Sequence, residues 1–419
     1  MSVRAQLRPK FMYFYKNKSK KMKSILGISV IILGIVLLTG CKDDPNKAAA
    51  PIEIKLAEIK KEFAPDKRVA LFDVNAIENN EEYILKGETN MPEALTALKN
   101  SLAADNIAFI DSIQVLPADY LGKTTRAIIN ISVANLRSNP GHSSELATQA
   151  TLGTIVKVYK KEDNWYYVQT PDNYLAWVDN GGVELADDQK AENWNRDEKM
   201  IYTRTYGHAY LGPGEDAQIV SDLTAGNLLT IVKYEYENYI VRFPDGRNAY
   251  VRRNEAEPYN EWLQNLNATN ETLVATAQEL MGVPYLWGGT STKGVDCSGF
   301  TKTVYFLNGM VIPRDASQQV HTGKSIDSTR NFENLQKGDL LFFGRKATDS
   351  TAEKVVHVGM WIGENEFIHS SGKVRVSSMD RGSKNYDEYN LNRYLRTKRI
   401  FQQKGKGLVD LKQTPLFKD

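Results

Sequence analysis

The sequence predicts a multidomain α+β protein, in which a small α+β unit and two small β-barrels precede a larger α+β domain. Three observations support this prediction. The chain has 419 residues, which is too long for one ordinary domain. The stretch over residues 153–178 recurs 73 residues later, at 226–251, and each copy has two strand-like runs joined through a Pro-Asp turn. After the repeat, helical and strand-like patterns alternate as far as residue 401.

The first 41 residues predict a signal peptide that ends at a lipidation site. Residues 1–40 contain eight Lys or Arg and no acid, and an uninterrupted run of low polarity covers residues 25–38. A membrane-spanning helix needs about 20 such residues, so this run of 14 fits the core of a signal peptide better. Leu38-Thr39-Gly40-Cys41 resembles the lipobox of bacterial lipoproteins, in which the cysteine is lipidated and becomes the mature N-terminus. The alternative is a short membrane anchor with an incidental cysteine.

Removal of this segment changes the charge and the cysteine count. The whole chain has 53 basic and 51 acidic residues, and without residues 1–40 the balance is 45 against 51, or about −6. No basic stripe remains, which argues against nucleic acid as a partner. If Cys41 carries lipid, Cys297 has no cysteine partner within the chain, so we expect a free thiol that has a function.

The composition and the patterns predict where each part begins and ends. Polar, Ala-rich sequence predicts a tether, and two strand-like runs, a helical run that begins near Pro92 and a further strand-like run predict the small α+β unit. After the signal peptide we expect a tether over residues 42–60, a small α+β domain over 61–120 and a first barrel over 121–190. We expect a second barrel over 191–257, a C-terminal α+β domain over 258–403 and a tail over 404–419.

Cys297 lies in the stretch GVDCSGF, at the start of a predicted helix that ends at Asn308-Gly309. The N-terminus of a helix lowers the pKa of a thiol, whereas the neighbouring Asp296 opposes ionisation. The helix alone is therefore not expected to give a good thiolate, and a base is required. Because an acid beside a reactive thiol is unfavourable, we expect Asp296 to bind a cationic group.

Two of the five histidines are candidates for that base. His357 and His369 enclose a stretch with two predicted strands, 358–362 and 367–370, around a Gly-Glu-Asn-Glu turn. Adjacent strands can bring both rings to one end of a sheet, where one ring takes the thiol proton and the other orients the first. The histidines that lack such a setting are His142, His208 and His321. No cluster has the spacing of metal ligands, so we expect no metal and no other cofactor.

Four blocks of the C-terminal domain resemble the NlpC-type cysteine peptidases of bacterial cell-wall metabolism. They occur in the order of that family over residues 270–400: YLWGGTSTKGVDCSGF, IPRDASQQ, LQKGDLLFF and HVGMWIG…FIHSSG. The resemblance implies an α+β papain-like fold for this domain. It also implies that Cys297 is the nucleophile, that His357 is the general base and that His369 is the orienting residue.

The same resemblance implies five substrate-binding residues. Those in the peptidase domain are Tyr285, Asp296 and Ser298. The repeat resembles bacterial SH3-like domains, and two such barrels before a peptidase domain resemble the YkfC-like γ-D-glutamyl-L-diamino-acid endopeptidases. In these enzymes a Glu and a Tyr from the first barrel meet the free amine of the substrate, and the matching residues are Glu145 and Tyr174.

The implied activity is hydrolysis of the γ-D-glutamyl-L-diamino-acid bond in peptides released from peptidoglycan that carry a free N-terminal L-alanine. The implied partners are these cell-wall peptides and, through lipid on Cys41, a membrane. We therefore expect the protein in the cell envelope, on the periplasmic or the surface face of the outer membrane. The sequence leaves three alternatives open: a hydrolase of intact peptidoglycan, an acyl transferase, and a cell-wall-binding lipoprotein with an inactive peptidase domain.

Overall fold

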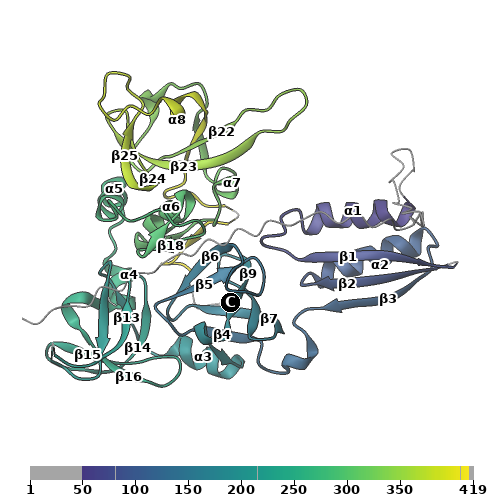
Figure 1. The fold of residues 1–419 in the computed structure, drawn as a ribbon, viewed down its shortest axis with the longest axis horizontal. Coiled ribbons are helices and arrows are strands. Elements are labelled where there is room, and N and C mark those ends of the chain that lie inside the picture. The colour runs from purple at the N-terminus through teal and green to yellow at the C-terminus, as the bar shows by residue number, and fades with distance from the viewer. Residues whose placement is uncertain (1–49, 81, 215, 406, 415–419) are drawn as a thin grey trace, which may run out of the picture. The chain divides into compact units, whose positions relative to one another are not determined.

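The computed structural model describes residues 50–80, 82–214, 216–405 and 407–414. The predicted signal peptide and Cys41 lie outside this range. None of the helices in the described range is long and apolar enough to cross a bilayer. The described chain forms an N-terminal α+β unit, two barrels and a C-terminal α+β domain, as predicted from the sequence (Figure 1).

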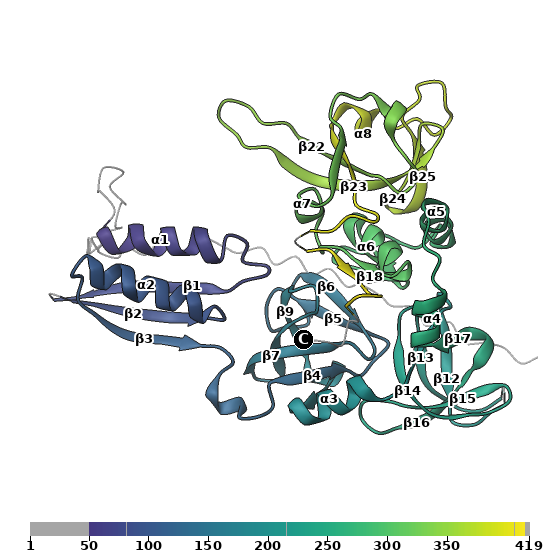
Figure 2. The same cartoon turned by 180° about the vertical axis from the view of Figure 1, so that it is seen from behind.

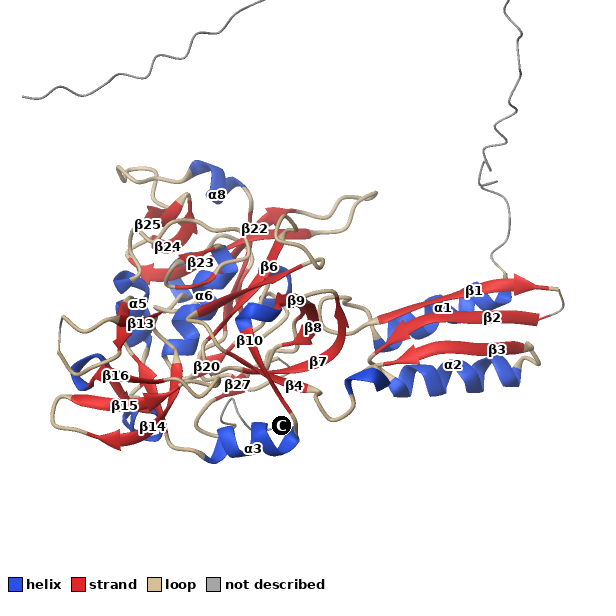
Figure 3. Cartoon of the chain, turned by 60° about the horizontal axis from the view of Figure 1, so that its bottom comes forward, coloured by secondary structure: helices blue, strands red, loops and turns tan. Residues whose placement is uncertain are grey.

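The N-terminal unit is a three-stranded sheet that packs against two helices (Figure 3). Its elements are α1 (Pro51–Phe63), β1 (Phe72–Asn79), β2 (Glu82–Thr89), α2 (Pro92–Ala104) and β3 (Phe109–Val115). Strand β2 is central, antiparallel to β1 and parallel to β3. The predicted tether is wrong for residues 51–60, because Ile52, Leu56 and Ile59 share one face of α1 and are buried in the core of this unit.

The two barrels share one strand order. The first consists of β4 (Arg126–Ile129), β5 (Val133–Arg137), β6 (Leu146–Thr151), β7 (Ile155–Glu162), β8 (Trp165–Gln169), β9 (Leu175–Asp179) and β10 (Val183–Ala186). After α3 (Asp188–Arg196), the second consists of β11 (Lys199–Tyr202), β12 (Gly207–Tyr210), β13 (Ile219–Leu223), β14 (Leu228–Tyr234), β15 (Asn238–Arg242), β16 (Asn248–Arg252) and β17 (Ala256–Pro258). The first sheet runs β10-β4-β7-β8-β9-β5-β6 and the second runs β17-β11-β14-β15-β16-β12-β13, which is the same order of equivalent strands.

Each copy of the repeat contains three strands, one more than predicted. The apolar run before the Pro-Asp turn folds back on itself, so that β7 pairs with β8 and β14 pairs with β15. Gly153 and Gly226 precede these hairpins at equivalent positions, with φ angles of 86° and 89°. A side chain is strained at such angles, so glycine suits both turns.

The C-terminal domain is built on a six-stranded antiparallel sheet with the order β21-β26-β22-β23-β24-β25. The strands are β21 (Lys324–Asp327), β22 (Leu340–Arg345), β23 (Lys354–Gly363), β24 (Glu366–Ser371), β25 (Lys373–Ser378) and β26 (Tyr394–Arg399). The helices are α4 (Tyr259–Asn265), α5 (Asn270–Glu279), α6 (Cys297–Leu307), α7 (Ala316–Gln319) and α8 (Glu388–Asn392). Helices α6 and α8 lie on opposite faces of the sheet (Figure 2), because Val358 and Ile368 pack with α6 whereas Trp361 and Phe367 pack with α8.

Short strands complete the domain around α6. The hairpin of β18 (Thr290–Ser291) and β19 (Gly294–Val295) leads into the helix, and β20 (Met310–Val311) follows it. Strand β20 pairs with β27 (Val409–Asp410), and Leu411 is buried against α4. Residues 409–411 therefore belong to the folded domain, and the predicted tail is wrong for them.

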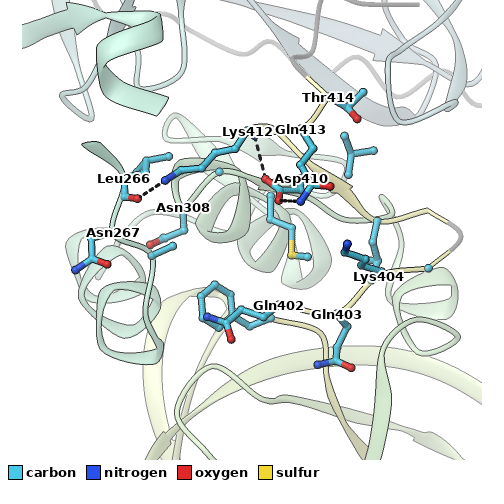
Figure 4. A pocket seen from close by; sticks show the side chains of 17 residues that line it. Leu266, Asn267, Asn308, Gln402, Gln403, Lys404, Asp410, Lys412, Gln413 and Thr414 are labelled. Carbon is cyan, nitrogen blue, oxygen red and sulfur yellow. Dashed lines mark hydrogen bonds between the residues drawn. The ribbon is translucent and has the colours of Figure 1, made fainter. Parts of the chain in front are cut away.

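The C-terminal segment also encloses a pocket of about 540 Å³ (Figure 4). Asn308, which follows the last residue of α6, is one of its lining residues, with Met310, Gln402 and Lys412. Cys297 is the first residue of α6, so this pocket lies at the opposite end of the helix from the thiol.

Candidate active site

Cys297 is the first residue of α6, as the sequence predicted, and Asp296 caps the helix. The Asp296 Oδ1 atom accepts a hydrogen bond of 2.7 Å from the backbone N–H of Gly299. A Cβ atom at Gly299 would lie 1.9 Å from the carbonyl oxygen of Gly289. Glycine at this position therefore lets the first turn of α6 pack tightly against the loop that precedes it.

The thiol of Cys297 is neutral in this setting. Burial raises its pKa to about 12, and the negative charge of Asp296 acts in the same direction. The backbone N–H of Val358 and the charge of Arg314 act against this rise without reversing it. Loss of water around the thiol outweighs the effect that a helix N-terminus has on an accessible cysteine.

The two predicted histidines lie on neighbouring strands and contact each other. His357 on β23 and His369 on β24 are joined by a hydrogen bond of 2.7 Å between Nε2 and Nδ1. The Nε2 atom of His369 in turn lies 3.0 Å from the Oγ atom of Ser377 on β25. Ser377 was not predicted, because a serine in a strand carries no sequence signal that separates it from other serines. The three side chains form one row across the sheet.

Both imidazole rings are neutral at neutral pH. Burial lowers the pKa of His357 well below its usual value, and the neighbouring His369 adds to the effect. Burial also lowers the pKa of His369, to about 3, with contributions from Arg375 and Arg393. A neutral imidazole can accept a proton, so the arrangement suits general base chemistry.

Asp296 binds a cationic group of the chain itself, the guanidinium of Arg314. Arg314 donates from Nη2 to Oδ2 at 2.6 Å and from Nη1 to Oδ1 at 3.1 Å. The arginine side chain is 1% exposed. The backbone N–H of Gly288 also donates to Oδ2, at 3.0 Å. Arg314 lies in the block IPRDASQQ, but nothing in the sequence pairs it with a residue 18 positions earlier.

Ser298 and Tyr285 lie beside the same carboxylate and thiol. The Ser298 hydroxyl donates to Asp296 Oδ1 at 3.3 Å and accepts from Arg314 Nη1 at 3.1 Å. Burial raises the pKa of the half-buried Tyr285 phenol, and the nearby Cys297 and Asp296 raise it further. The structure thus brings both predicted residues of the peptidase domain to the start of α6.

The first barrel supplies the other two predicted residues. Glu145 accepts a hydrogen bond of 2.6 Å from Nε1 of Trp287, which lies two residues after Tyr285. The Tyr174 hydroxyl donates to Oδ2 of Asp315 at 3.1 Å. Asp315 directly follows Arg314, the residue that binds Asp296. The contact of Tyr174 with Asp315 therefore lies next to the Arg314–Asp296 ion pair in the chain. Asp315 was not predicted as a site residue.

The remaining histidines stay apart from this row. His142 lies 3.6 Å from Asp179 in the first barrel, His208 bonds Tyr206 in the second, and His321 is exposed. Within the described residues, no group of three or more His, Cys, Asp or Glu side chains has the geometry of a metal site.

Comparison with known proteins gives two family matches. The model of the NlpC/P60 family matches residues 282–394, and the model of the bacterial SH3 domain matches residues 132–184. The chain is similar to the gamma-D-glutamyl-L-lysine dipeptidyl-peptidase of Bacillus cereus, with 32% identity over 55% of this chain and 68% of the relative. It is also similar to dipeptidyl-peptidase 6 of Lysinibacillus sphaericus, with 28% identity over 61% of this chain and 92% of the relative.

A solved structure supports the same assignment. The crystal structure of an NlpC/P60 family protein from Bacillus cereus matches 66% of this chain and 99% of its own, with a TM-score of 0.56 and 25% identity. In this chain, a papain-like domain follows a bacterial SH3 domain and a second barrel with the same strand order. The chain therefore belongs to the NlpC/P60 family of peptidases, which act on peptides of peptidoglycan.

Proposed function

We propose that the protein is a cysteine peptidase that hydrolyses the γ-D-glutamyl-L-diamino-acid bond of peptides released from peptidoglycan. The observation that carries the proposal is the row of His357, His369 and Ser377 across the sheet that packs on α6, with the Val358 N–H at the thiol of Cys297. The name of the Bacillus cereus relative, a gamma-D-glutamyl-L-lysine dipeptidyl-peptidase, supports this bond as the substrate.

In the proposed reaction, the thiol of Cys297 gives its proton to His357 while the sulfur attacks the γ-carbonyl carbon of D-glutamate. The C–N bond then breaks, and the amine of the diamino acid leaves with the proton from the imidazolium, so that a thioester remains. Water attacks the thioester and gives a proton to His357. The thiolate leaves, takes up that proton, and the enzyme returns to its resting state.

The proposal assigns one tautomer to each histidine. The 2.7 Å bond occupies Nε2 of His357, so Nδ1 is the nitrogen that remains for the thiol proton. Nε2 of His357 then carries hydrogen and donates to Nδ1 of His369. His369 in turn donates from Nε2 to the Ser377 hydroxyl, which accepts at 3.0 Å. One consistent set of donors thus holds the base ready for proton transfer.

We further propose that the first barrel selects a free N-terminal amine. Glu145 is exposed and receives one hydrogen bond, from Trp287, so its other oxygen can meet an ammonium group. Tyr174 joins the carboxylate of Asp315, which adds a second acid on the side of the first barrel. Asp296 and Asp315 each bind an arginine of the chain, Arg314 and Arg68 respectively, and the proposal assigns the ammonium contact to Glu145.

The experiment is incubation of the mature protein with L-Ala-γ-D-Glu-L-Lys and with its diaminopimelate analogue, followed by chromatography for L-Ala-γ-D-Glu. We expect release of the dipeptide by the wild type and none by Cys297→Ser. Substantial turnover by the serine variant contradicts the assignment of the nucleophile. Activity on intact peptidoglycan alone, with no cleavage of the tripeptides, contradicts the proposal that released peptides are the substrate.

A membrane anchor at Cys41 completes the proposal. Cys41 ends the Leu-Thr-Gly-Cys sequence that follows the apolar run. Labelled fatty acid should enter the wild type and not Cys41→Ala, and the variant should leave the membrane fraction or remain uncleaved. Incorporation of label into the variant would place the lipid elsewhere.

A further inference from the structure

Arg68, in the loop between α1 and β1, crosses from the N-terminal unit to the peptidase domain. Its Nη1 atom donates to Oδ2 of Asp315 at 2.7 Å and to the hydroxyl of Ser317 at 2.9 Å. Asp66 holds the other side of the guanidinium, accepting from Nε and from Nη2 at 2.8 Å each. Gln318 closes the contact by donating to Asp66 Oδ2 at 2.8 Å.

The first barrel fixes the loop that carries Arg68. The Arg68 carbonyl accepts from the backbone N–H of Leu175 at 2.7 Å, and the Val69 carbonyl accepts from Nε2 of Gln169 at 3.0 Å. Leu71 packs on a small apolar cluster that includes Leu175. Because the first barrel holds two backbone carbonyls and an apolar side chain of this loop, the backbone position from which the Arg68 side chain extends is fixed.

Arg68 is the outer end of a row of alternating charges that leads to the thiol. Arg68 binds Asp315, the next residue is Arg314, and Arg314 binds Asp296, the cap of the helix that begins with Cys297. Asp315 Oδ2 accepts from both Arg68 and Tyr174. Without Arg68, this carboxylate loses its nearest charged donor and keeps Arg314, whose Nη1 atom lies 3.8 Å from Oδ1. The Tyr174 hydroxyl is then bonded to an acceptor that is held less firmly.

We propose that the N-terminal unit supplies a positioning residue to the peptidase site: Arg68 holds the Asp315 carboxylate, and through it Tyr174, at the end of the site that receives the amine of the substrate. This inference rests on the proposed function, since it deepens the amine selection assigned to the first barrel. It gives the N-terminal unit a role in substrate recognition, beyond that of a spacer.

The test compares Arg68→Met with Glu88→Gln in the full chain. Glu88 lies in the same unit and forms an ion pair with the first barrel, 2.5 Å from Lys160, whereas the ion pair of Arg68 with Asp315 reaches the peptidase domain. For L-Ala-γ-D-Glu-L-Lys, we expect Arg68→Met to raise KM by about tenfold, as loss of a charge-assisted hydrogen bond does, and to leave kcat and the alkylation rate of Cys297 near those of the wild type. Glu88→Gln should keep the KM of the wild type, and Arg68→Lys should recover part of the loss.

Three outcomes overturn the inference. Equal rises of KM in Arg68→Met and Glu88→Gln would mean that the unit acts only by docking. An unchanged KM in Arg68→Met would mean that Asp315 and Tyr174 need no such support. A lower KM would mean that Arg68 competes with the substrate amine.

A measurement without substrate separates this inference from the proposed function. Hydrogen exchange of the α7 amides of Gln318 and Gln319, which bond the Asp315 carbonyl, should speed up in Arg68→Met and not in Glu88→Gln. If the wild type fails to cleave the tripeptide but this difference appears, the proposed substrate is wrong and the positioning contact stands. If exchange is the same in both variants, the positioning role is overturned whatever the substrate.

Discussion

The Cys297 thiol and the His357 imidazole are both uncharged at rest, because both side chains are buried. The same loss of water raises the pKa of Cys297 to about 12 and lowers the pKa of His357. In the proposed mechanism, proton transfer from Cys297 to His357 therefore accompanies attack on the substrate. A thiol that is neutral at rest is also less readily oxidised than a permanent thiolate.

Alkylation of the free enzyme tests this protonation state. Because only the thiolate reacts, the rate of modification of Cys297 by iodoacetamide should rise about tenfold per pH unit from pH 7 to 10. The measurement is the second-order rate constant, with the modified residue located by peptide mapping. A rate that is already constant below pH 8 would instead indicate a thiolate–imidazolium pair. The Cys297→Ser variant, which should take up no label in this peptide, is the control.

The two histidines differ in role although they share one hydrogen bond. His357→Ala should lower kcat by about 10²–10⁴-fold, the usual contribution of a general acid–base group, and His369→Ala should cost clearly less because that ring orients the first. Steady-state kinetics on the tripeptide give the comparison, with the exposed His321→Ala as control. Equal small losses in both variants would show that neither ring is the base.

At the scale of elements, the N-terminus of α6 depends on a loop that the sequence places far from it. Arg314 precedes α7, and its fork on Asp296 ties this loop to the cap of α6. The arginine also donates to the Thr148 hydroxyl of β6 at 3.1 Å, so one buried side chain joins two parts of the peptidase domain to the first barrel. The N-terminus of the helix that begins with Cys297 is therefore held by Arg314, a residue outside that helix.

Arg314→Met should destabilise the protein severely. Removal of one partner from a buried ion pair leaves the other charge without compensation, at a cost of about 3–5 kcal/mol. We expect a clearly lower melting temperature by calorimetry and little residual activity. Arg381→Met, at an exposed arginine, should behave as the wild type. A stable variant at position 314 with normal activity would show that Asp296 needs no internal cation.

The sequence predicts elements whose signals are local and misses contacts between distant residues. The helix after Asp296 and the strands around Glu364-Asn365 follow from apolar spacing, capping and turn residues that lie side by side in the chain. The pairing of Asp296 with Arg314 spans 18 residues, and that of Arg68 with Asp315 spans 247. No pattern in one sequence links such positions, because each partner alone looks like an ordinary surface charge.

For the molecule as a whole, the peptidase site is assembled from more than the peptidase domain. Glu145 and Tyr174 of the first barrel contact residues that flank the start of α6, and Arg68 of the N-terminal unit contacts the same loop. Hairpin β18–β19 is held by both barrels, because Thr290 bonds Gln149 and Lys293 pairs with Asp222. A peptidase domain without these partners would keep the row of two histidines and Ser377 but lose the contacts that the first barrel and the N-terminal unit make beside α6.

Amine selection by the first barrel can be measured with two substrates. N-acetylation of the L-alanine should sharply lower kcat/KM of the wild type, because the carboxylate of Glu145 is then left without the ammonium group that it is proposed to bind. Glu145→Gln should reduce the difference in kcat/KM between the free and the acetylated peptide, mainly because its kcat/KM for the free peptide is lower. Glu162→Gln, an exposed glutamate of the same barrel, should retain the full difference. Equal cleavage of both peptides by the wild type would contradict the selection and favour an enzyme of intact peptidoglycan.

Because the two barrels share one strand order, equivalent positions of the two copies can be compared directly. Both copies keep the glycine before the hairpin and the Pro-Asp turn, at Gly153 and Gly226 and at 171–172 and 244–245. At the position of Tyr174, however, the second copy has Arg247, which turns back to bond Asp245 of its own loop. What both copies retain is what the barrel needs in order to fold. Tyr174, which differs between the copies, contacts the peptidase domain instead. Positions at which the first barrel differs from the second and contacts the peptidase domain are therefore the first to exchange in a redesign of substrate specificity.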